Sequence, residues 1–178
     1  MQPFFSPDGQ SIAFFHRIQR VIKRVGIAGG RAVTLCDAAF PFGGCWAEDG
    51  YLYFTGDTGA GLVRVSQSGG RTETVLDLDE SQGELRQGAP YMLPGGDAML
   101  IASARGHSTD HVDIAVASLR TKLCVTIARG AMRPHYLQSG HVLYVANGGV
   151  LAAAFDVSAG TQAGPAIDVS EAQMVVPA

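Results

Sequence analysis

A turn followed by an apolar run occurs four times in the sequence, and this repeat restricts the possible folds more than any other feature. Each copy ends its turn on a glycine: Gly9, Gly50, Gly96 and Gly140. The steps between them are 50 − 9 = 41, 96 − 50 = 46 and 140 − 96 = 44 residues. A period of this length is typical of arrays in which each repeat is one supersecondary unit that packs on its neighbours.

Each repeat contains short runs with the length and composition of β-strands. Runs rich in branched and aromatic residues follow the turns at 11–15, 51–54, 98–102 and 141–145. Further runs lie at 22–27, 62–66, 112–117 and 150–155, and again at 32–35, 72–76 and 124–127. No segment has sustained helical periodicity. Asp8-Gly9 and Asp49-Gly50 favour tight hairpins, because glycine adopts a positive φ without steric cost.

The composition agrees with a turn-rich β-protein. Hydrophobic residues make up 47% of the 178 residues, charged residues only 16%, and there are 23 glycines. Disorder is unlikely for a chain with so little charge, and long helices would not tolerate so many glycines. The net charge of −3 argues against nucleic-acid binding by bulk electrostatics.

Four short strands in a repeat of forty-odd residues are typical of the blades of a β-propeller, in which each sheet packs face to face on the next. We therefore expect an all-β fold of about four four-stranded blades, forming a partial or open propeller. The expected blades cover roughly residues 3–37, 41–80, 87–129 and 131–172 of a single domain. Packing on both faces explains the nearly continuous apolar strands and the scarcity of charge.

The run Phe5-Ser6-Pro7-Asp8-Gly9 resembles the Ser-Pro-Asp-Gly blade motif of TolB-like, WD-repeat-like bacterial propellers. The stretch from Gly149 to Asp156 is similar to propeller regions that follow the kinase domain in some bacterial serine/threonine protein kinases. These resemblances imply protein partners and a periplasmic or extracytoplasmic location. Family members usually close rings of six or seven blades, so four blades indicate either a fragment of a larger propeller or an open array that is closed by self-association. Because proteins normally cover unpaired blade faces and strand edges, we expect a homo-oligomer.

Targeting signals are not evident in the sequence. The first residues lack the basic region, apolar stretch and cleavage site of a signal peptide. The longest apolar stretch, 142–155, is interrupted by Asn147-Gly148-Gly149 and is too short to span a bilayer. The residues themselves indicate no compartment, so the location rests on the family resemblance. No membrane insertion is expected.

The most polar cluster lies in the connection of residues 106–113. Its candidates for a binding site are His107, Asp110, His111 and Asp113. Imidazole and carboxylate groups can bind a divalent metal, but a solvated loop is the favoured interpretation, and we expect neither a metal nor another cofactor. A Ser108-based catalytic triad is disfavoured, because neighbours on one loop rarely reach triad geometry and no nucleophile elbow is present.

Other groups of residues have a structural and a functional interpretation. An acidic stretch is expected to be a solvated connection rather than a calcium site: Asp77, Asp79, Glu80 and Glu84. A basic run is expected to protect a sheet edge, with an acidic partner as the alternative: Arg17, Arg20, Lys23 and Arg24. Aromatic residues before the turns are expected to pack between blades, with a ligand stack in the channel as the alternative: Trp46, Tyr91, His135 and Tyr136.

The sequence thus predicts a binding or sensing module without catalysis of its own. A rigid array would present its loops and channel mouth to a protein or peptide partner. The alternative is a propeller that belongs to an enzyme, either a metal-dependent lactonase-like hydrolase or the gating propeller of a prolyl-oligopeptidase-type hydrolase. A metal at the channel would favour the first of these alternatives, and a neighbouring hydrolase domain the second.

Overall fold

The computed structural model of the chain describes residues 3–39, 41–56, 60–105 and 112–170. Blade 1 comprises β1 (Phe4–Phe5), β2 (Ser11–His16), β3 (Val21–Gly26) and β4 (Val33–Asp37). Blade 2 comprises β5 (Gly44–Trp46), β6 (Tyr51–Thr55), β7 (Leu62–Ser66) and β8 (Glu73–Leu76). Blade 3 comprises β9 (Arg86–Met92), β10 (Ala98–Ala104), β11 (Val112–Ser118) and β12 (Cys124–Ala128). Blade 4 comprises β13 (Ala131–Leu137), β14 (His141–Ala146), β15 (Gly149–Asp156), β16 (Thr161–Gln162) and β17 (Ile167–Asp168).

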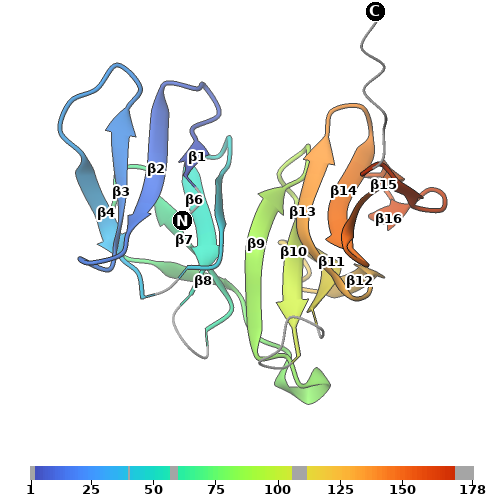
Figure 1. The fold of residues 1–178 in the computed structure, drawn as a ribbon. Helices are drawn as coiled ribbons and strands as arrows, with labels where there is room; N and C mark the ends of the chain where they lie inside the picture. Colours follow the sequence, from blue (N-terminus) through green and yellow to red (C-terminus); the bar gives the residue numbers. More distant parts are fainter. Residues whose placement is uncertain (1–2, 40, 57–59, 106–111, 171–178) are drawn as a thin grey trace, which may run out of the picture.

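Every sheet is an antiparallel meander in which strands adjacent in sequence pair with each other. In blade 4 the outer strand is divided, because β16 pairs with the end of β15 and β17 pairs with its beginning. A short 3₁₀ helix, η1 (Glu80–Gln82), lies between blades 2 and 3. The structure confirms the predicted all-β architecture of four propeller blades (Figure 1).

The repeated turns have the predicted backbone geometry. Gly9, Gly50, Gly96 and Gly140 all have a positive φ, between 68° and 80°. In the first turn the Asp8 carboxylate accepts hydrogen bonds from the Ser6 hydroxyl (2.5 Å) and the Gln10 amide (3.0 Å). In the second, Asp49 accepts from the Tyr51 amide at 3.0 Å. Each aspartate side chain thus stabilises its hairpin by accepting a hydrogen bond from the backbone amide two residues later, as the sequence indicated.

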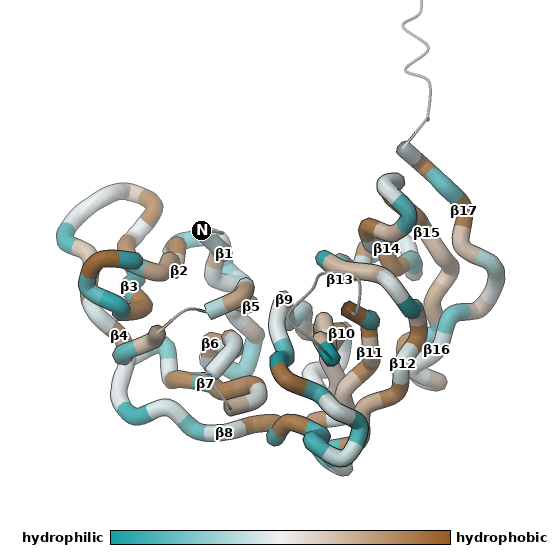
Figure 2. Tube along the Cα trace, turned by 60° about the horizontal axis from the view of Figure 1, so that its bottom comes forward, coloured by the Kyte–Doolittle hydropathy of each residue, from teal (hydrophilic) through white to brown (hydrophobic). Residues whose placement is uncertain are grey.

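The sheets pack face to face in an open arc, with the innermost strands β1, β5, β9 and β13 on its concave side (Figure 2). Separate apolar clusters join neighbouring blades. The cluster between blades 1 and 2 contains Ala13, Leu52 and Phe54. Tyr53 and Met99 belong to the cluster between blades 2 and 3. Leu100, Val142 and Tyr144 belong to the one between blades 3 and 4. Among the described residues no such cluster joins blade 4 to blade 1, so the arc has two end faces.

The innermost strands of blades 3 and 4 contain an irregularity that the sequence analysis did not predict. Ala89 and Arg133 have positive φ values of 45° and 56°, and the register shifts opposite each of them. Gly43 of blade 2 stands at the same distance before its turn glycine, with φ +84°. Each of these residues lies seven positions before the turn glycine. The left-handed residue bends the inner strand, as a β-bulge does.

The basic run lies elsewhere than predicted. Lys23 and Arg24 belong to β3, which pairs with both β2 and β4, so they are in the interior of the sheet rather than on its edge. Alternation along β3 then directs them to opposite faces of blade 1. The expectation of edge protection is therefore wrong for these two residues, because β3 is not a terminal strand of its sheet.

The three cysteines differ in their exposure to solvent. Cys36 is buried and Cys45 half-buried, but Cys124 is exposed on the outer strand of blade 3. Burial raises the pKa of the Cys45 thiol to about 12. Within the described ranges, no helix has the length and apolar character needed to cross a membrane.

Candidate functional site

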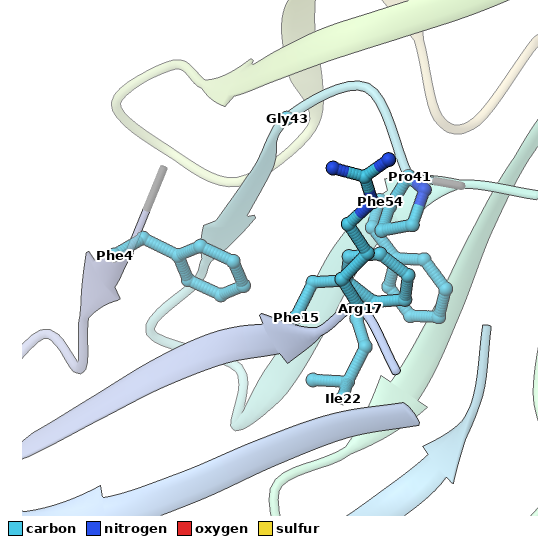
Figure 3. A pocket seen from close by; sticks show the side chains of 7 residues that line it. All are labelled: Phe4, Phe15, Arg17, Ile22, Pro41, Gly43 and Phe54. Carbon is cyan, nitrogen blue, oxygen red and sulfur yellow. The ribbon is translucent and has the colours of Figure 1, made fainter. Parts of the chain in front are cut away.

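A pocket of about 170 Å³ lies between blades 1 and 2. It is formed where β1 begins, β2 ends, and the chain passes from β4 to β5, so it opens at the end of the blades reached by β2, β6, β10 and β14. We call this the pocket end. The lining is mainly apolar: Phe4, Phe15, Ile22, Pro41, Gly43 and Phe54, with Arg17 as the charged member (Figure 3).

The sequence places the aromatic rings of this pocket by strand alternation and by a missing side chain. Phe15 on β2 and Phe54 on β6 are directed toward the space between the blades, and the adjoining cluster contains both residues. Phe4 reaches across from β1 to β5, where a Cβ on Gly44 would lie 2.7 Å from the Phe4 ring. Glycine at position 44 is therefore required for this ring to pack on the neighbouring blade.

Arg17 supplies the positive charge of the pocket. It begins the turn between β2 and β3 and is exposed, and Figure 3 shows its guanidinium group on the Pro41 side of the pocket. The turn is closed by the Gln19 amide, which donates to Nδ1 of His16 at 3.2 Å. Arg17 is in neither ion pair of the described residues, which are Arg64–Glu73 and Arg105–Asp113. A guanidinium beside an apolar pocket can bind a carboxylate in a bidentate manner.

Phe42 lies next to the pocket and is exposed, although its backbone is firmly held. Its amide donates to Oγ1 of Thr55 (3.0 Å), and its carbonyl accepts from the same hydroxyl (3.2 Å). That carbonyl also accepts from the Ala89 amide at 2.5 Å, which links the innermost strands of blades 2 and 3. These bonds fix the position from which the side chain leaves the backbone.

The Phe42 ring lies over blade 3. A Cβ on Gly88 would be 2.7 Å from the ring, so the ring packs directly on the β9 backbone. The Arg86 guanidinium is 5.1 Å from the ring centroid, in a cation–π arrangement. The side chain nevertheless remains 45% exposed. A large, positioned and accessible aromatic residue of this kind is typical of binding hot spots.

The predicted polar cluster is described only in part. His107, Asp110 and His111 lie outside the described residues, so their role as binding residues stays a prediction. Asp113 is buried at the beginning of β11, where Oδ1 accepts from the Gly130 amide at 3.1 Å. Its other carboxylate oxygen, Oδ2, is 3.8 Å from Nη1 of Arg105. Asp113 therefore holds the turn into blade 4. In the described part of the chain, no three His, Cys, Asp or Glu residues are grouped so that they could hold a metal.

Part of the acidic stretch is buried, in contrast to the prediction of a solvated connection. Glu84 accepts hydrogen bonds from the Ser103 hydroxyl (2.5 Å), the Gln87 side-chain amide (2.8 Å) and the Asp79 backbone amide (2.9 Å). Gln87 in turn accepts from the Leu62 amide of blade 2 at 3.2 Å. Asp79 caps η1 and is exposed, as predicted. The donors to the Glu84 carboxylate replace the water lost on burial. Gln87, which Glu84 holds in place, makes the hydrogen bond that joins blades 2 and 3.

The aromatic residues before the turns mostly pack between blades, as predicted. Trp46 is buried in the cluster between blades 1 and 2, and Tyr136 packs against the cluster between blades 3 and 4. Tyr91 contacts the exposed His135 ring at 4.4 Å between centroids, across blades 3 and 4. No ligand stack is needed to account for these contacts.

Sequence reasoning missed the pocket because its residues come from separate segments. Arg17 was considered only as part of the basic run, and Phe42 was not considered. The one local signal is the run Pro41-Phe42-Gly43-Gly44, in which the two glycines leave room for the Ala89 backbone and for the Phe4 ring. The contribution of Phe4, Phe15 and Phe54 depends on how blades 1 and 2 pack, which no single segment encodes.

Comparison with models of known families and with curated protein sequences gives no match. Solved structures of β-propeller proteins, in contrast, resemble the chain. TolB from Acinetobacter baumannii has a TM-score of 0.68 at 15% identity, over 85% of this chain and 39% of that one. Regucalcin from Agrobacterium tumefaciens, described as a calcium-binding protein, has a TM-score of 0.66 at 17% identity, over 93% and 57% of the two chains. A gluconolactonase from Xanthomonas campestris has a TM-score of 0.67 at 10% identity, over 93% and 60%.

These similarities establish the fold and leave the function open. The chain spans between 39% and 60% of the length of these three proteins. They include a TolB protein and a gluconolactonase, so the same blades serve different functions. Any function must therefore be argued from the side chains of the chain itself.

Proposed function

We propose that the chain is a β-propeller binding module that docks a peptide segment of a protein partner at its pocket end. The peptide would insert an apolar side chain between blades 1 and 2 and place a neighbouring carboxylate on Arg17. The observation that carries this proposal is the pairing of an aromatic pocket with a cation that has no ion-pair partner among the described residues.

Phe42 and Arg86 support the same interpretation. They extend the site from the pocket toward blade 3, so a docked segment of a few residues could contact both. The hydrogen bonds at Phe42 preorganise the aromatic ring, which lowers the entropy lost on binding. The pocket is large enough for one side chain but small for a complete small-molecule ligand, because ligand sites usually measure about 300–1,000 Å³.

An enzyme remains the alternative function. It would require catalytic or metal-binding groups from outside the described residues, with His107, Asp110 and His111 as the candidates. The described residues offer no particular arrangement that favours it, and binding is therefore proposed first.

A random dodecapeptide library displayed on phage is a direct test. Peptides selected on the 178-residue chain should share an aromatic or aliphatic residue adjacent to Asp or Glu. The affinity of a selected synthetic peptide should fall about tenfold in Phe42→Ala and several-fold in Arg17→Gln, and it should also fall with added salt. Arg120→Gln, in the exposed turn at the opposite end of blade 3, is the matched control.

The proposal fails if the selected peptides lack an acidic residue, or if their affinity is the same in all three variants. Thermal unfolding of each variant shows whether it retains the fold, since Arg17 and Phe42 are exposed and should tolerate substitution.

A further inference from the structure

The two end faces of the arc carry residues that are buried at the equivalent positions of the other blades. On the blade 1 end face lie Phe5, Ile12, Phe14 and Val25, because these residues alternate with those that pack on blade 2. On the blade 4 end face lie Leu143, Val145, Val150 and Ala152, which alternate with the residues that pack on blade 3.

The hairpins define which positions are equivalent. In each blade the residue just before the first turn faces the first residue of the second strand: Ser6 and Ser11, Ala47 and Tyr51, Leu93 and Ala98, Leu137 and His141. Counting from there, Ile12 of blade 1 corresponds to Leu52, Met99 and Val142. Phe14 corresponds to Phe54, Ile101 and Tyr144.

All six counterparts are buried against the preceding blade, with exposed fractions between 0% and 5%. Ile12 and Phe14 are only half-buried, and Phe5 is 56% exposed. The blade 1 end face is therefore an interface of the same type as those inside the chain, and no blade among the described residues covers it. The blade 4 end face is of the complementary type, the face that packs on the following blade inside the chain. Its residue Leu143 corresponds to Ala13, Tyr53 and Leu100, which pack on the following blade and have exposed fractions of 0% to 1%.

We infer that the blade 4 end face of one copy of this chain packs on the blade 1 end face of a second copy. Within the chain, a face of one type always meets a face of the other, so head-to-tail packing repeats an interface already present three times. Two copies with four blades each make eight, which is within the range of about four to eight blades that propellers close. Closure by two copies covers both end faces of each chain and leaves none for further growth.

One residue of the blade 1 end face departs from the pattern. Lys23 pairs with Phe14 and occupies the position of Val63, Ala115 and Leu151 in the other blades. It is half-buried, and its aliphatic stem can lie along the interface while the ammonium group reaches water. The other residues named on the two faces are apolar, and alternation adds one histidine to each face, His16 two residues from Phe14 and His141 two residues from Leu143. The mostly apolar character favours a blade as the occupant over a charged or polar partner.

The mass of the chain in solution, measured by light scattering and sedimentation from 1 to 100 µM, tests the inference. The wild-type chain should form a dimer. Ile12→Glu and Val145→Glu each place a charge on one end face and should weaken self-association about 100-fold or more. Leu123→Glu, an exposed residue in the turn before β12, should leave it unchanged.

Mixing the two variants distinguishes head-to-tail packing from other arrangements. A mixture of Ile12→Glu and Val145→Glu retains one unaltered pair of faces, the blade 1 face of the second variant and the blade 4 face of the first. The mixture should therefore form heterodimers although each variant alone is monomeric, which also shows that both variants are folded.

A wild-type monomer at 100 µM overturns the inference and indicates that further blades or another protein cover these faces. Dimers that persist in one variant alone also overturn it, because they require contact between identical faces. This inference does not depend on the proposed peptide site, which lies between blades 1 and 2 rather than on an end face.

Discussion

Phe5 and Trp46 occupy the same position in blades 1 and 2, yet Trp46 is 8% exposed and Phe5 is 56% exposed. Both pair with the second residue of the following strand, Phe5 with Ile12 and Trp46 with Leu52. Trp46 is covered by blade 1, whereas no blade in the described part of the chain covers Phe5. The contribution of an aromatic residue at this position to the free energy of unfolding therefore depends on whether a neighbouring blade covers it.

The first prediction concerns this pair. Trp46→Ala should lower the free energy of unfolding by about 3–5 kcal/mol, because a large buried side chain leaves a cavity. Phe5→Ala, measured at 1 µM to limit self-association, should cost less than about 1 kcal/mol. Urea unfolding of both variants provides the comparison, and equal losses would show that Phe5 is buried in solution.

A second prediction compares two glycines with similar backbone conformations. A Cβ on Gly43, at φ +84°, would lie 2.8 Å from the Ala89 Cα, whereas Gly95, at φ +93°, has open space. Gly95→Ala should cost about 1–2 kcal/mol for the left-handed conformation alone. Gly43→Ala should cost clearly more in urea unfolding, because the innermost strands of blades 2 and 3 must also separate. Similar losses would mean that this contact readily relaxes.

The buried carboxylate of Glu84 allows a third prediction. Ser103→Ala removes a donor to Glu84 and should lower the free energy of unfolding by about 1.5–3 kcal/mol, as expected for a buried hydrogen bond to a charged group. Ser81→Ala removes an exposed hydroxyl that donates to Asp79 and should cost no more than about 0.5 kcal/mol. Chemical denaturation of both variants distinguishes a buried link from a solvated one.

Tyr53 carries a prediction on pH dependence. Burial, and then the hydrogen bond that its hydroxyl donates to Asp49 at 2.7 Å, raise the pKa of Tyr53 from 10.0 to about 12. A pKa that is higher in the folded than in the unfolded chain contributes stability that is complete below pH 10. This contribution is lost as the pH rises toward 12.

The urea midpoint of the wild-type chain should therefore fall between pH 10 and 12 more steeply than that of Tyr53→Phe. Tyr51→Phe, on the same strand, should retain the wild-type dependence. If the two variants behave alike, the Tyr53 hydroxyl is not the group responsible.

Much of the fold follows from the sequence because its signals are local. The turn glycines and Asp8 and Asp49 are recognisable in short segments, and the structure bears out their geometry. The site was not predictable in the same way. Arg17 and Phe42 form a candidate site only together with residues of other strands. The burial of Glu84 likewise depends on the packing of blade 3, which its own segment does not reveal.

The repeat, the strands and the hairpins can be derived from the sequence, because steric preferences of glycine and aspartate and the pattern of apolar residues act within a few positions. The packing of the blades is needed to establish which of two equivalent aromatic residues is buried, where Arg17 lies, and which strand is an edge. Those properties arise from the packing of one blade on the next, where residues distant in the chain exclude water from each other's surfaces.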